Sequence, residues 1–300
     1  MSFINSVSYK IFKLKNKKIG KDIYQDIVNR APVYGLRNDY NNNEQVVVSM
    51  TTFSKRYSTI IPSLKSLLNQ TYKPNHIIVW LDDDIPENKI TSEMEKFKDY
   101  GIEFRNTTYH LKPHTKYFYA MQEYNKANII TVDDDLVYSP DLIESLMKMH
   151  SVYPDCVCAR RVHKIKLDAN GNIVPYKNWI YECRSIIKPS YMLCATGCGG
   201  VLYPPHIMPE ETFNVEAIRE NCLCADDIWL KVMQLIAGIK VVWVPSNYIM
   251  PYEVQGSQEV ALNIINTNGD RNDEYINILK EKYPIIQERL VDEYKSIKNR

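Results

Sequence analysis

The chain has 300 residues, which is enough for one large α/β domain or two smaller ones. Hydrophobic residues make up 45% and charged residues 24%, the balance of an ordinary globular protein. The formal net charge is +1, so no nucleic-acid partner is expected, because general nucleic-acid binders are usually clearly basic.

Residues 1–44 are predicted to form a basic arm and a linker. The first acidic residue, Asp22, is preceded by Lys10, Lys13, Lys15, Lys17, Lys18 and Lys21. Interleaved apolar residues are typical either of a solvated, partly helical arm or of a segment that rests on an anionic membrane surface. The sequence shows no run of about 20 apolar residues and no secretory signal. With seven cysteines, an odd count that favours free thiols, these features predict a cytoplasmic protein, with peripheral contact at the cytoplasmic membrane face as an alternative.

From residue 45, strand and helix patterns alternate. The predicted strands are "QVVVSM", "HIIVWL", "IEFRNT" and "NIITV", and the segments between them have helical spacing, one of them closing at Gly101. Short apolar strands separated by helices predict an α/β fold with a mostly parallel central sheet. In such sheets the ligand crevice lies beyond the carboxyl ends of the strands. Residues 50–52, 82–84 and 133–135 all fall at those ends.

The second half is less regular. Asn170-Gly171 between apolar flanks predicts a hairpin. "TGCGGVLYPP" contains three glycines, which suits a close approach of the backbone to another group. "ADDIWLKVMQLIAG" is predicted to be a helix, "IKVVWVP" a strand, and residues 270–299 a C-terminal helical segment.

Three consecutive aspartates, Asp133, Asp134 and Asp135, follow the strand "NIITV". In an extended segment the side chains of Asp133 and Asp135 point the same way, whereas Asp134 diverges. Two converging carboxylates need a counter-charge, and a divalent cation such as Mg²⁺ or Mn²⁺ supplies it. Capping of the next helix is the alternative, but Ser139 is expected to provide that cap. The triplet therefore favours a metal and diphosphate site.

In this order the motifs resemble a bacterial GT-A glycosyltransferase of the family 2 type, which builds surface polysaccharide. The resemblance rests on "VVVSMTTFSKR", "LLNQTYKP", "IIVWLDDD", "ANIITVDDDLVYSPDLI", "GGVLYPP" and "ADDIWL". It implies a GT-A (Rossmann-like) fold and a hexosyltransferase that uses a UDP-sugar and Mn²⁺ or Mg²⁺. The acceptor would be a hydroxyl group of a glycan or lipid-linked glycan. It also implies a nucleotide-sugar-binding half at 45–138, an acceptor-binding and catalytic half at 139–250, and a C-terminal loop and helices at 251–300.

On the donor side, the resemblance gives roles to single residues. Asp133 and Asp135 match the family's Asp-x-Asp motif, with Asp135 as the more direct metal ligand and Asp134 beside it in the donor site. Thr51 and Thr52 would line the nucleoside pocket.

Three further donor contacts are implied. Arg56 would lie near the phosphates. Asp82 or Asp83 would pair with the uracil or the ribose, although acids are also favoured at the start of a helix. Lys116 would offset the diphosphate charge, with an ordinary surface lysine as the alternative.

For the chemistry, Asp226 and Asp227 are the predicted catalytic residues. Inverting transfer needs a base that removes the acceptor proton. "DDIWL" resembles the family's acid–Asp–x–x–Leu signature, which makes Asp227 the base and Asp226 a supporting acid. Helix capping, worth about 1 kcal/mol, is the structural alternative.

The acceptor wall is predicted to come from the glycine-rich segment and nearby aromatic residues. Gly199 and Gly200 would allow close approach. Tyr203 and Trp229 could stack on sugar faces, unless they belong to the core. No histidine follows His206, so the further metal ligand that many GT-A enzymes supply late in the chain would have to come from residues 266–273, or from phosphates and water.

Two other functions remain open. A nucleotidyltransferase that activates a sugar phosphate also uses metal-bound carboxylates, but it usually carries a glycine-rich phosphate loop, and "SMTTFSKRY" has no glycine. A non-catalytic member would bind only nucleotide or glycan. All three aspartate clusters are intact, which favours a working site.

Overall fold

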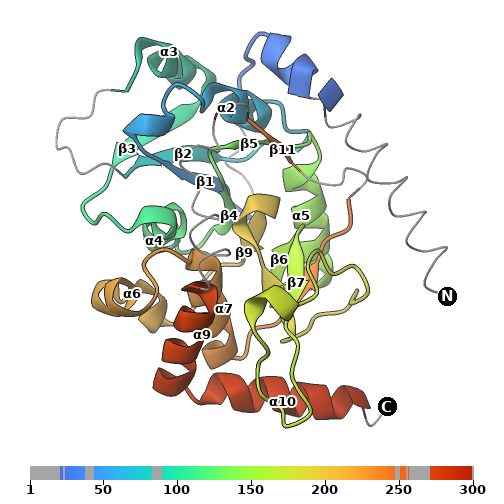
Figure 1. Ribbon diagram of the computed structural model, residues 1–300. Helices are drawn as coiled ribbons and strands as arrows, with labels where there is room; N and C mark the ends of the chain where they lie inside the picture. The colour runs from blue at the N-terminus through green and yellow to red at the C-terminus, as the bar shows by residue number, and fades with distance from the viewer. Residues whose placement is uncertain are drawn as a thin grey trace.

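The computed structural model describes residues 21–22, 24–37, 44–82, 90–246, 251–254, 256 and 271–298. Within these residues a seven-stranded sheet has the order β10-β6-β9-β4-β1-β2-β3 (Figure 1). Its strands are β1 (Val46–Thr52), β2 (His76–Leu81), β3 (Ile102–Asn106), β4 (Asn128–Val132), β6 (Val157–Ala159), β9 (Val201–Tyr203) and β10 (Val241–Trp243). Two smaller sheets pair β5 (Leu136–Val137) with β11 (Tyr252–Glu253), and β7 (Val162–Lys164) with β8 (Leu193–Ala195).

The central sheet is mostly parallel, as predicted. β1 pairs in parallel with β2 and β4, and β2 with β3. β9 runs antiparallel to both β4 and β6, so β4 and β6 have the same direction. The carboxyl ends of β1, β2, β4 and β6 therefore lie along one edge of the sheet.

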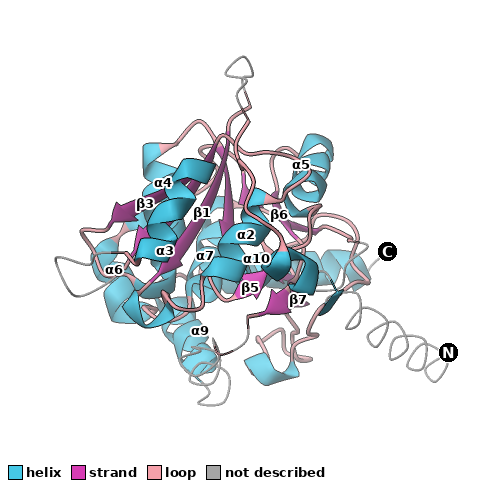
Figure 2. Cartoon of the chain, turned by 90° about the horizontal axis from the view of Figure 1, so that it is seen from above, coloured by secondary structure: helices cyan, strands magenta, loops and turns pink. Residues whose placement is uncertain are grey.

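Helices cover both faces of the sheet, and Figure 2 shows the strands between them. On one face, Val46, Val48 and Met50 of β1 pack in a core with α2 (Ile61–Leu68) and α5 (Leu142–Val152). On the other face, Val47 packs near α4 (Thr115–Glu123). Side chains along β1 point alternately to the two faces of the sheet. Because both faces are buried, apolar residues are favoured at successive positions, in agreement with the continuous β-branched sequence of the strand.

The remaining helices are short or lie in the second half. They are α3 (Ser92–Glu95), α6 (Val215–Asn221), α7 (Asp226–Ala237), α9 (Arg271–Lys282) and α10 (Ile285–Lys298). Leu279 of α9 and Leu290 of α10 share a buried core with α7, which confirms the predicted C-terminal helical segment. Figure 1 shows α9 and α10 together at the foot of the molecule.

Two of the expected turns are confirmed. Gly101 ends a short 3₁₀ segment with φ 97°, a left-handed conformation that favours glycine. At the predicted hairpin, Gly171 has φ 87° and the Asp168 N–H donates to the Asn172 carbonyl at 2.8 Å.

The predicted cap at Ser139 is wrong. α5 begins at Leu142, and its N-cap residue, Asp141, makes no side-chain capping bond. The Ser139 hydroxyl donates to Asp141 Oδ1 at 2.6 Å instead. Pro140 and Asp141 form a turn that separates Ser139 from the helix start.

Near the N-terminus, residues 24–29 are helical. Tyr24 and Ile27 pack against Val137 and Val254, and the Tyr24 and Tyr252 rings lie 5.0 Å apart. The lysine-rich part of the predicted arm, residues 1–20, lies outside the described residues, so its membrane contact stays a prediction. Among the helices that the structure describes, none has the length and apolar content of a membrane span.

Ile143 tests the packing of α5 on the sheet. Its side chain is completely buried, so Ile143→Ala is expected to lower the free energy of unfolding by about 2–5 kcal/mol through lost burial and a cavity. The same change at Ile297, which is 53% exposed in α10, should shift it by less than about 0.5 kcal/mol. Urea denaturation measures both. Equal effects of the two changes would contradict the described packing.

Candidate active site

The site lies where the chain changes direction across the sheet. After β1 the chain builds β2 and β3 on one side, then returns to form β4 on the other side of β1. Ligands of open α/β sheets bind at such a switch point. Met50 and Val132 are paired in register, so Thr52 and Asp133 follow at neighbouring strand ends. A hydrogen bond of 2.7 Å from Thr52 Oγ1 to Asp134 Oδ2 joins the two ends.

Arg56 binds two carboxylates of the aspartate triplet. Its Nη1 lies 2.5 Å from Asp134 Oδ1 and 3.0 Å from Asp135 Oδ2. Asp134 is buried, and both of its carboxylate oxygens bond to the loop around Thr52 and Arg56. Asp134 therefore fixes the loop after β1. Asp135 approaches the same Arg56 nitrogen, whereas Asp133 contacts Lys116.

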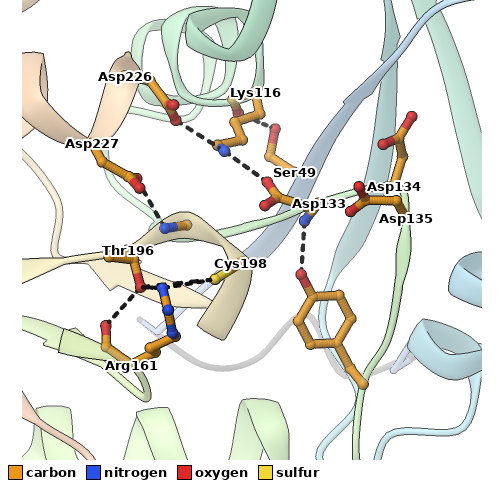
Figure 3. Close-up of polar contacts among 12 residues, drawn as sticks. Ser49, Lys116, Asp133, Asp134, Asp135, Arg161, Thr196, Cys198, Asp226 and Asp227 are labelled. Atoms are coloured by element: carbon orange, nitrogen blue, oxygen red, sulfur yellow. Dashed lines mark hydrogen bonds and ion pairs between the residues drawn. The ribbon is translucent and has the colours of Figure 1, made fainter. Parts of the chain in front are cut away.

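Lys116 connects the aspartate triplet to the start of α7. Its Nζ lies 2.7 Å from Asp133 Oδ1 and 2.9 Å from Asp226 Oδ2 (Figure 3). The side chain is only 5% exposed, so it is not an ordinary surface lysine. Burial by itself would lower the pKa of Lys116, but Asp133 and Asp226 outweigh it and hold that pKa well above its ordinary value.

Asp226 and Asp227 open α7, and their environments differ. Burial opposes ionisation of Asp226, but Lys116 outweighs it and lowers the Asp226 pKa. Burial, and next the charge of Asp226, raise the pKa of Asp227 to about 7. Asp227 Oδ1 accepts a hydrogen bond of 2.9 Å from the Gly197 N–H. One acid of the pair stays ionised while the other titrates near neutrality, which is the pattern of a supporting acid beside a base.

Gly197 lies close to the Lys116 head group and to the Asp227 carboxylate. A Cβ at Gly197 would lie 2.7 Å from Lys116 Nζ and 3.3 Å from Asp227 Oδ1. A side chain at this position would therefore displace the Lys116 ammonium from its place.

Asp133 and Asp135 suit a divalent cation by their chemistry. Burial, followed by the charges of Asp133 and Asp134, raises the pKa of Asp135 to about 6. Such crowding of carboxylates is relieved by Mg²⁺ or Mn²⁺, which prefer oxygen ligands. The described residues contain no group of three or more His, Cys, Asp or Glu side chains that could hold a metal ion. Most of the alternative ligand segment 266–273 lies outside the described residues.

The expected nucleoside contacts lie at the ends of β1 and β2. Thr51 Oγ1 donates to the Trp80 carbonyl at 3.3 Å. Asp82 Oδ2 accepts a bond of 2.7 Å from the Lys112 N–H, and Asp82 Oδ1 lies 3.6 Å from His110 Nδ1. Asp82 therefore supports the loop at 107–112. Asp83 lies outside the described residues.

Most of the expected acceptor wall is internal, which corrects the sequence analysis. Trp229 is completely buried and donates from Nε1 to the Thr212 carbonyl at 3.1 Å, so neither ring face is open to a sugar. Tyr203 is also buried. Gly199 and Gly200 lie against Arg161 and Leu142, where a Cβ would come within 2.5 Å and 2.6 Å of them. The two glycines thus serve packing inside the protein.

Several contributing residues were missed in the sequence analysis. Ser49 donates to the Lys116 carbonyl at 2.5 Å, and Tyr138 accepts from the Asp133 N–H at 2.8 Å. Arg161 follows β6 at the same edge of the sheet. The signal for Arg161 was present in "VCARR", a short apolar run that ends in two charges, as the aspartate-tipped strands do.

Comparisons with known proteins agree with this architecture. The family model described as glycosyl transferase family 2 matches residues 47–202. A mannosyltransferase from Pyrobaculum calidifontis, solved with GDP-Man and Mn²⁺, superposes with a TM-score of 0.50 at 10% identity, over 94% of this chain and 79% of that one. A CMP:2-keto-3-deoxy-manno-octonic acid synthetase solved with CTP gives a TM-score of 0.43 at 9% identity, over 75% of this chain and 100% of that one.

At such low identities, the first structural likeness shows a shared fold alone, and it confirms the expected GT-A (Rossmann-like) class. The family match is more informative, because residues 47–202 are more than half of the 300-residue chain. They include Arg56, Lys116 and the whole aspartate triplet. The chain belongs to glycosyl transferase family 2 and is a glycosyltransferase.

Proposed function

We propose that the enzyme moves a sugar from a UDP-sugar to a hydroxyl group of a glycan or lipid-linked glycan in surface polysaccharide assembly. The transfer would invert the anomeric carbon and use a divalent cation. The observation that carries this proposal is the double ion pair of Lys116, which holds Asp133 and Asp226 within one site.

On the donor side, we assign Mn²⁺ or Mg²⁺ to Asp135 and Asp133. When bound, the cation would neutralise charge on the donor diphosphate as it leaves. Arg56 and Lys116 add fixed positive charge beside the same carboxylates. Thr51, with Asp82 or Asp83, remains the proposed nucleoside contact.

On the acceptor side, we assign the general base to Asp227. A base is most effective when its pKa lies near the working pH, and burial raises the pKa of Asp227 to about 7. The Gly197 N–H fixes the carboxylate, leaving its second oxygen for the acceptor hydroxyl. Asp226, kept ionised by Lys116, favours the proton on Asp227 once it has been accepted.

Thermal melting with nucleotides tests the donor assignment. We expect UDP with Mn²⁺ to raise the melting temperature more than UDP or Mn²⁺ alone, because metal and diphosphate share one site. GDP is the direct comparison, since the solved mannosyltransferase was captured with GDP-Man. A larger shift with GDP would change the proposed donor base from uracil to guanine. No shift with any nucleotide would refute the donor site.

Asp135→Asn removes one proposed metal ligand without changing its size. The variant should fold and lose the extra stabilisation that Mn²⁺ gives to the UDP complex, because a neutral amide is a weak ligand for a hard cation. Asp155→Asn, at an exposed position, is the matched control and should keep that stabilisation. An unchanged metal effect in Asp135→Asn would overturn the metal assignment.

Asp227→Asn tests the base. Transfer should fall by about 10²-fold or more while UDP affinity is preserved, since the amide cannot accept the proton. In the native enzyme, kcat/KM should rise with pH until about 7 and then level off, because protonated Asp227 is inactive below its pKa. The Asp155→Asn variant should follow the native profile. Full transfer by Asp227→Asn would place the base elsewhere.

Lys116→Met tests the link between the two carboxylate pairs. Removing the ammonium deprives the carboxylates of Asp133 and Asp226 of the cation they share. The free energy of unfolding at pH 7 should therefore fall by about 3–5 kcal/mol. The deficit should shrink as the pH falls towards 4, because protonation removes the unpaired charge. Lys98→Met, at a half-exposed ion pair, should change stability by less than about 0.5 kcal/mol. A deficit independent of pH would show that Lys116 acts only through packing.

A further inference from the structure

Arg161 is a partly buried cation near the proposed base. It follows β6, and β6 runs in the same direction as β4, so Arg161 and Asp133 lie at the same edge of the sheet. The side chain is 20% exposed. Its Nη1 donates to Thr196 Oγ1 at 3.0 Å and to Cys198 Sγ at 3.4 Å (Figure 3).

The charge of Arg161 is less well satisfied than that of the other two site cations. Arg56 and Lys116 each contact two carboxylates within 3.0 Å. Within the described part of the chain, the one carboxylate neighbour of Arg161, Glu182 Oε1, is 4.0 Å away, and Arg161 Nε, like Arg56 Nε, has no hydrogen-bond partner. A buried donor without a partner is unfavourable unless a ligand supplies the acceptor.

Arg161 belongs to the base side of the site. The loop at 196–200 holds both groups: Gly197 N–H donates to Asp227, and the Thr196 N–H donates to the Arg161 carbonyl at 3.1 Å. Burial opposes the charged form of Arg161, and Cys198 and Glu182 favour it most among its neighbours, with smaller effects from Tyr176 and Asp227.

Three aromatic rings lie near enough to Arg161 for its charge to affect them: His163, Tyr176 and Tyr181. Tyr181 is 39% exposed, and its ring centroid lies 4.4 Å from His163 and 5.7 Å from Tyr176. Burial and the charge of Arg161 lower the pKa of His163 to about 3, so the imidazole is neutral near pH 7. A guanidinium beside partly exposed aromatic rings can bind a sugar that carries an anionic group.

Resting on the function proposed above, we infer that Arg161 recognises an anionic group on the acceptor. The guanidinium fork would bind a phosphate or a sugar carboxylate, and Tyr176 and Tyr181 would contact the sugar ring. Both anions offer the paired oxygens that a guanidinium binds in bidentate fashion. Arg161 would thus determine acceptor specificity without touching the leaving diphosphate.

Ligand binding to the UDP–Mg²⁺ complex tests this inference. Glucose 1-phosphate, glucuronic acid and glucose serve as probes, and calorimetry or ligand-observed NMR gives each Kd. At least one anionic sugar should bind the native protein more tightly than glucose. Arg161→Gln, which keeps a polar side chain but removes the charge, should weaken that sugar by about tenfold and leave glucose unchanged. The Kd of Arg161→Lys for that sugar should lie between the native value and the Arg161→Gln value.

The outcomes separate the sources of the anion and the alternatives. Preference for glucose 1-phosphate indicates a phosphorylated acceptor, and preference for glucuronic acid an acidic sugar. Equal binding of all three probes to the native protein would overturn the inference, as would an unchanged preference in Arg161→Gln. A parallel loss of UDP affinity in that variant would assign Arg161 to the donor and also overturn it.

Two controls complete the design. Arg105→Met removes a guanidinium that is paired with Glu103 at the far edge of the sheet, and it should keep the native preference. If Arg161→Gln does not fold, the Arg161→Lys variant decides: an anion Kd equal to the native value contradicts the inference, and a weaker one supports it. Failure of UDP to bind the native protein would refute the proposed function itself, whereas intact UDP binding without anion preference refutes only the role of Arg161.

Discussion

The geometry of the site depends on one buried ammonium group. Lys116 Nζ lies 2.7 Å from Asp133 Oδ1 and 2.9 Å from Asp226 Oδ2. The first carboxylate follows β4 and the second begins α7. Without the cation they would repel each other in a region of low water content. The backbone fixes the lysine, because Ser49 of β1 bonds to its carbonyl, and Gly197 leaves room for its head group. Lys116 thereby joins β1 through its backbone, and the ends of β4 and α7 through its ammonium.

This constraint gives neighbouring carboxylates different properties. The two carboxylate oxygens of Asp134 accept hydrogen bonds from Thr52 and Arg56, so Asp134 stabilises the fold. Asp226 stays ionised beside Lys116, and its charge together with burial raises the pKa of Asp227. Enzymes commonly obtain distinct acid and base roles by this kind of environmental difference. These aspartates have the same side chain, and their different partners give them different properties.

Much of the fold could be predicted from sequence, because strand and helix periodicity is strong in residues 45–138 and parallel strands bring their carboxyl ends together. That argument placed the aspartate triplet correctly at the sheet edge. Local patterns could not show that Trp229 is completely buried, or that the Ser139 hydroxyl bonds to Asp141 instead of capping α5. Arg161 was missed for a related reason: β6 has only three residues and takes its direction from β9, which begins 42 residues after β6 ends. The direction of such a short strand depends on pairing with a distant segment of the chain, which local patterns do not show.

The most direct measurement is a crystal structure of the enzyme with UDP and Mn²⁺, with manganese located by its anomalous scattering. We expect one anomalous peak within coordination distance of Asp135 or Asp133, in contact with the diphosphate, and Asp227 facing the side where the sugar would project. A UDP molecule bound away from the aspartate triplet, or manganese bound to other residues, would contradict the proposed link between the donor site and the base through Lys116.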